Sequence, residues 1–130
     1  MVIRRVPYES WEQSTLIQWW HSGGRQSLGL PEQALLYSIP NGACKSPAAA
    51  QQFKREGLLA GVPDLFLAWP SGGRHGLYIE MKRRAGGRVS PEQTETMAAL
   101  SAAGYSCAVC HGWNEAASAI ATYIHGGSHG

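Results

Sequence analysis

Two short apolar runs on either side of a glycine-rich linker constrain the fold of this chain more than any other feature. The runs span 64–69 and 77–82, and each has the length and apolar character of a buried strand. The linker, 70–76, is short and contains Gly72, Gly73 and Gly76, which favours a β-hairpin. In an antiparallel pair the start of the first strand then lies beside the end of the second.

Helix and strand signals alternate along the rest of the chain. Apolar spacing predicts helices over 9–21, 46–56, 90–103 and 114–124, and the last three have Ser46, Ser90 and Asn114 as expected N-caps. Further strands are predicted over 34–39 and 105–110. A length of 130 residues suits a single domain, with its core over about 9–124 and a frayed tail over 125–130. The predicted fold class is α/β, a mixed central β-sheet flanked by α-helices.

Three charged side chains are expected to meet at one end of the predicted hairpin. Asp64 opens the first strand, while Glu80 and Lys82 lie two residues apart near the end of the second and therefore share a face. Close carboxylates repel one another and resist desolvation, and a divalent cation removes that cost. Oxygen ligands suit Mg²⁺ or Mn²⁺, and a lysine can orient water or stabilise transition-state charge.

The ordered motifs around these charges resemble the VRR-NUC branch of the PD-(D/E)XK nucleases, which have a restriction-endonuclease-like fold. The matching segments are Gly61-Val62-Pro63-Asp64, Glu80-Met81-Lys82, Ile39-Pro40-Asn41-Gly42 and Ser90-Pro91-Glu92-Gln93. The resemblance covers about 9–124. One departure is Ser38, which stands where many relatives carry a histidine.

The resemblance implies a role for each matching residue. Asp64, Glu80 and the backbone carbonyl of Met81 would bind the metal, and Lys82 would be the catalytic lysine. Glu12, on the first predicted helix, matches an acidic position near the metal site, which makes it a candidate catalytic residue and a further candidate ligand.

Gln93 matches a helix glutamine that faces the site, and so is a further candidate catalytic residue. Two of these supporting positions also have purely structural interpretations. Gln93 fits a capping box with Ser90, and Glu12 fits an ordinary exposed helix position. At the level of function, the resemblance implies a homodimeric endodeoxyribonuclease acting on structured or branched DNA, such as a Holliday junction, in repair or recombination.

The charge of the chain is informative only through its placement. The net charge is +2, yet six of the eleven basic residues flank the predicted site in sequence: Lys54, Arg55, Lys82, Arg83, Arg84 and Arg88. Phosphate contacts would explain this grouping, and a solvated loop is the alternative. Asn41 is a further candidate for nucleic-acid contact, although Asn-Gly is also a common turn pair. No segment resembles a recognition helix, so base-specific readout is not predicted.

The sequence is also compatible with two rival functions. One is a non-catalytic DNA-binding module of the same fold. The other is a thiol redox or haem protein, because Cys107 and Cys110 precede His111 in a C-x-x-C-H pattern. Within a strand, however, residues three apart point to opposite faces. The cysteine count is odd, no apolar run follows Arg4-Arg5, and no apolar stretch is long enough to span a membrane. Together these features predict a cytoplasmic protein.

Overall fold

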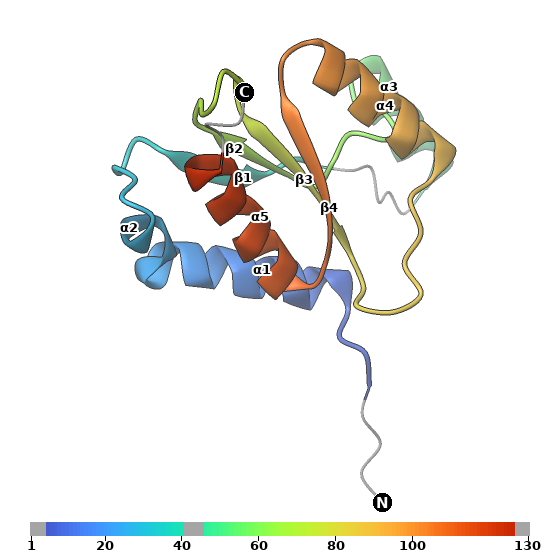
Figure 1. Ribbon diagram of the computed structural model, residues 1–130. Coiled ribbons are helices and arrows are strands. Elements are labelled where there is room, and N and C mark those ends of the chain that lie inside the picture. The colour runs from blue at the N-terminus through green and yellow to red at the C-terminus, as the bar shows by residue number, and fades with distance from the viewer. Residues whose placement is uncertain (1–4, 41–45, 127–130) are drawn as a thin grey trace, which may run out of the picture.

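The strands form one mixed four-stranded sheet in the computed structural model, which describes residues 5–40 and 46–126 (Figure 1). In sheet order these are β1 (Leu35–Ser38), β2 (Leu65–Ala68), β3 (Leu77–Lys82) and β4 (Ser106–His111). β1 pairs antiparallel with β2, β2 pairs antiparallel with β3, and β4 runs parallel to β3. The predicted hairpin is therefore confirmed as β2–β3.

Helices flank this sheet on both faces, as predicted (Figure 1). They are α1 (Glu9–Trp19), the π-helical turn η1 (Trp20–Gly24), α2 (Arg25–Ser27), α3 (Pro47–Arg55), α4 (Pro91–Ala102) and α5 (Trp113–His125). α1 and α5 pack against each other and against β3. α4 lies on the opposite face, where the Cys107 thiol of β4 contacts the Met97 carbonyl of α4 at 3.8 Å.

The hydrophobic core lies between the sheet and the α1–α5 pair. Leu65, Leu67 and Ile79 are fully buried on this face, together with Leu16 of α1 and Ile120 of α5. The intervening strand residues point to the other face because side chains alternate along a strand. That second face carries Asp64 and Glu80, so the alternation of apolar residues orients the candidate site.

The ends of the helices follow the sequence in some places and not in others. The Ser46 and Ser90 hydroxyls each accept a hydrogen bond of 3.1 Å from a backbone N–H of the first turn, which confirms both predicted caps. The sequence pattern predicts that the first helix ends before Gly23-Gly24. Instead Gly23, with φ of 147°, interrupts the helix locally and the chain continues through η1 into α2.

The predicted cap at Asn114 is wrong. The N-cap residue of α5 is Gly112, and Asn114 lies inside the first turn, where its side-chain oxygen accepts a 2.6 Å hydrogen bond from Arg84. His125 belongs to α5 rather than to the predicted frayed tail, and 127–130 lie outside the described residues. Among the helices described, none is long and apolar enough to cross a membrane.

Candidate active site

The β2–β3 hairpin brings together the three charged residues that the sequence singled out. Leu65 pairs with Ile79, so the next position in the register places Asp64 beside Glu80. Lys82 Nζ lies 3.4 Å from Glu80 Oε2, and the Met81 backbone N–H donates a 2.7 Å hydrogen bond to Asp64 Oδ2. The cluster therefore contains two neighbouring carboxylates and an ammonium group on one face of the sheet.

Burial makes this cluster electrostatically costly. Glu80 is 3% exposed and Lys82 is 8% exposed. Burial, followed by the nearby charge of Asp64 and hydrogen bonding with it, raises the pKa of Glu80 to about 7, and Lys82 only partly opposes that rise. Two carboxylates held together in this way repel each other when both are ionised. A bound cation would offset that repulsion.

The raised pKa predicts how the stability of the metal-free protein depends on pH. Between 4.5 and about 7, folded Glu80 keeps a proton that the unfolded chain has released. The corresponding stability is fully present below pH 4.5 and is lost as the pH rises through about 7, a loss of about 3 kcal/mol. Urea unfolding in EDTA across this range should show the decline in wild type. Glu80→Gln should largely remove it, and equal slopes for the two proteins would contradict the prediction.

The available donor atoms fit a hydrated Mg²⁺ or Mn²⁺ ion. A strand residue directs its N–H and C=O toward the same neighbouring strand; since the Met81 N–H reaches Asp64, the Met81 carbonyl faces that side as well. In the ranges 5–40 and 46–126, no three His, Cys, Asp or Glu side chains group into a metal site. A protein contribution of two carboxylates and one carbonyl suits Mg²⁺, which usually keeps several water ligands.

Gln93 lies in the first turn of α4, which packs against the loop that leads into Asp64. Gly61 in that loop has φ of +90°, and a Cβ there would lie 2.4 Å from the Glu92 carbonyl oxygen. Gln93 and Ser90 form the predicted capping box, with the Ser90 N–H donating to Gln93 Oε1 at 2.9 Å. Its structural role is thus confirmed, and its catalytic role stays a prediction.

Glu12 is fully buried on α1, the helix that packs with α5 on the sheet face opposite the carboxylate pair. Its carboxylate accepts hydrogen bonds of 2.7 and 3.0 Å from Arg84, and a third of 3.0 Å from the Trp113 backbone N–H. Trp113 is the first residue of α5, so Glu12 caps that helix from a distant part of the chain. These contacts show a structural task for Glu12, and its proposed part in metal binding stays a prediction.

The candidate DNA-binding residues divide into two groups. Arg83 donates to the Val6 carbonyl at 2.7 Å and lies over the Tyr8 ring, while Arg84 binds Glu12, so both side chains have protein partners. Arg84 is nonetheless exposed. The second group, which is also exposed, consists of Lys54, Arg55 and Arg88. Arg55 also donates to Gln52 on its own helix. Asn41 lies outside the described residues.

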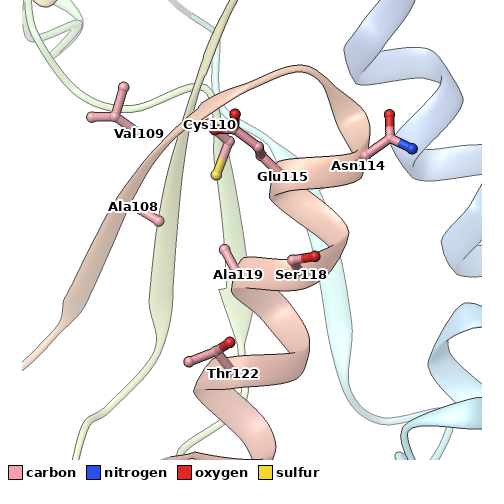
Figure 2. A pocket seen from close by; sticks show the side chains of 8 residues that line it. All are labelled: Ala108, Val109, Cys110, Asn114, Glu115, Ser118, Ala119 and Thr122. Carbon is pink, nitrogen blue, oxygen red and sulfur yellow. The ribbon is translucent and has the colours of Figure 1, made fainter.

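The two cysteines of β4 point to opposite faces, as the strand interpretation predicts. Cys107 faces α4, and Cys110 lines a pocket of about 360 Å³ between β4 and α5 (Figure 2). Burial raises the pKa of both thiols, that of Cys110 to about 12. Raised pKa values leave both sulfurs protonated near neutral pH, which opposes a thiol redox function. The pocket contains none of the charged residues of the hairpin.

Sequence reasoning missed the aromatic residues that stand beside the carboxylates. Phe66 and Tyr78 are partners across β2 and β3, and each lies two residues from a carboxylate on the same strand. Their rings approach to 4.4 Å between centroids. The signal that could have found them is the two-residue period of strands, because that period places Phe66 on the face of Asp64 and Tyr78 on the face of Glu80.

The mixed sheet flanked by helices places the domain in the α/β class, and its central hairpin carries the carboxylate–lysine cluster. The family model of the VRR-NUC domain matches residues 3–114. The chain therefore belongs to the VRR-NUC domain family, and nuclease activity and DNA binding are the functions that this membership supports.

A solved structure supports the same assignment of the fold. It is described as a VRR_NUC domain protein, is 26% identical to this chain and superposes with a TM-score of 0.73. The match covers 93% of this chain and 91% of the other. No curated protein matches the chain.

Proposed function

We propose that this chain is a Mg²⁺- or Mn²⁺-dependent endodeoxyribonuclease that hydrolyses phosphodiester bonds in structured or branched DNA. The observation that carries the proposal is the buried Glu80 carboxylate, which lies beside Asp64 and 3.4 Å from Lys82 Nζ. A structural scaffold gains nothing from burying two adjacent carboxylates. A site for a divalent cation and a phosphodiester uses all three charges.

Each residue of the cluster has a distinct task in this proposal. Asp64, Glu80 and the Met81 carbonyl would hold the cation. When bound, the cation supplies a water of lowered pKa and offsets charge on the scissile phosphate. Lys82, held in place by Glu80, can donate hydrogen bonds to the attacking water or to the phosphate oxygens as their charge develops. Its burial keeps that charge poorly screened and therefore effective.

The DNA backbone is proposed to contact the exposed basic group, Lys54, Arg55 and Arg88. These contacts position the substrate without reading its sequence, and they make binding weaker as salt concentration rises. Family resemblance supports a homodimer, in which a two-fold axis would present two sites to a symmetric junction. Sedimentation velocity would detect this dimer directly.

The proposed activity is tested by cleavage of a labelled substrate panel that contains single-stranded, duplex, flap and four-way-junction DNA. We expect cleavage with Mg²⁺ or Mn²⁺, none in EDTA, and faster cleavage of the branched substrates than of the linear duplex. Cleavage of no substrate with either metal would overturn the enzymatic proposal. In that case, retained DNA binding would favour the non-catalytic module.

A further inference from the structure

A row of aromatic side chains crosses the face of the sheet that carries the carboxylates. Tyr37 of β1 pairs with Phe66 of β2, which in turn pairs with Tyr78 of β3. Directly paired residues share a face, and so do residues two apart on one strand. The row therefore lies one such step, about 7 Å along the strands, from the pair formed by Asp64 and Glu80.

The rings in this row contact one another continuously. Centroid distances are 5.9 Å for Tyr37–Phe66, 4.4 Å for Phe66–Tyr78 and 5.4 Å for Tyr78–Tyr105. Tyr37 is 46% exposed, and the other three are partly exposed. Leu35, the other β1 residue on this face, is also exposed. The β1 end of the row is thus open to solvent.

We propose that Tyr37, Phe66 and Tyr78 form a stacking platform for an unpaired nucleotide next to the scissile phosphate. This inference rests on the proposed nuclease function and adds a preference for unpaired DNA at the site. Every base has a π-face, so stacking on aromatic side chains holds a single strand without selecting its sequence.

The chemistry of the row favours an unpaired strand over a duplex. A ring stacks only on a base whose π-face is free, and within a duplex the neighbouring base pairs cover both faces of each base. The rings stand about 7 Å along the strands from the carboxylates, so a base stacked on them lies close to a phosphate held at Asp64 and Glu80. A second copy of the chain seated on the row would obstruct the phosphodiester's approach to the carboxylates, so DNA is the occupant that the site favours.

The test compares binding of a duplex with a single-stranded tail and a blunt duplex of equal length, measured by fluorescence anisotropy in EDTA. Tyr37→Leu should weaken binding of the tailed duplex by about five- to a hundredfold, because one base–ring contact is lost. Binding of the blunt duplex should change by less than about twofold. Tyr37→Phe should retain the wild-type preference. Trp11→Leu is the control, since Trp11 is exposed on α1, which packs on the opposite face.

Several outcomes would overturn the platform. If Tyr37→Leu loses equal affinity for both DNAs, or loses none for either, the platform proposal is wrong. The nuclease proposal then still stands, provided that wild type cleaves DNA. A change from dimer to monomer in Tyr37→Leu, without altered DNA preference, would make this face a contact between copies. If wild type neither binds nor cleaves any DNA of the panel, the proposed function fails and the platform fails with it. Thermal melting of each variant controls for misfolding.

Discussion

Glu80→Gln is expected to lower metal-dependent cleavage by about a thousandfold or more. Glutamine keeps the size of the side chain and one carbonyl oxygen, but it carries no charge to offset a cation. The same substitution should stabilise the metal-free protein above pH 7, since it removes a buried charge that repels Asp64. Single-turnover cleavage with Mg²⁺ and thermal unfolding in EDTA measure the two effects.

A substitution that lowers cleavage while raising stability marks Glu80 as a functional residue, because loss of a structural residue would lower both. Glu32→Gln is the matched control, because Glu32 is exposed and lies outside the cluster. It should leave both cleavage and unfolding near wild type. Cleavage by Glu80→Gln within about tenfold of wild type would contradict a metal-ligand role for Glu80.

Arg84→Ala is expected to destabilise the folded protein by about 3 kcal/mol. Its guanidinium holds the fully buried Glu12 carboxylate in two hydrogen bonds of 2.7 and 3.0 Å. Without Arg84 that carboxylate stays buried with the Trp113 N–H but without its cation, so most of its desolvation cost is uncompensated. Urea unfolding followed by tryptophan fluorescence measures the change in the free energy of unfolding.

A double variant isolates the electrostatic part of this loss. Glu12→Gln combined with Arg84→Ala should be more stable than Arg84→Ala alone, because no buried charge is left behind. A loss below about 1 kcal/mol in Arg84→Ala would show that the pair contributes little to stability. Arg84 would then be available for the phosphate contact that its place in the sequence suggests.

The parts of the site that follow from local periodicity could be predicted from the sequence. A short glycine-rich linker fixes the hairpin, and the two-residue period of its strands fixes the face of Glu80 and Lys82. The caps at Ser46 and Ser90 are equally local, since each hydroxyl reaches a backbone group three residues away. These features need no knowledge of the remaining chain.

Roles that depend on distant partners could not be predicted in the same way. Arg83 and Arg84 follow the site in sequence and read as phosphate contacts, yet they bind Val6 and Glu12 from the N-terminal region. Asn114 resembles a helix cap, but its side chain accepts from Arg84. Nothing local to these residues specifies which charged or polar group the fold brings against them.

Manganese binding measured by electron paramagnetic resonance tests, without DNA, whether Asp64 and Glu80 hold a divalent cation. Wild type and Glu32→Gln should both bind Mn²⁺, while Asp64→Asn and Glu80→Gln should lose that binding and retain cooperative unfolding. Unchanged Mn²⁺ binding in both site variants, or no binding by wild type at any concentration that supports cleavage, would contradict cation binding by this pair.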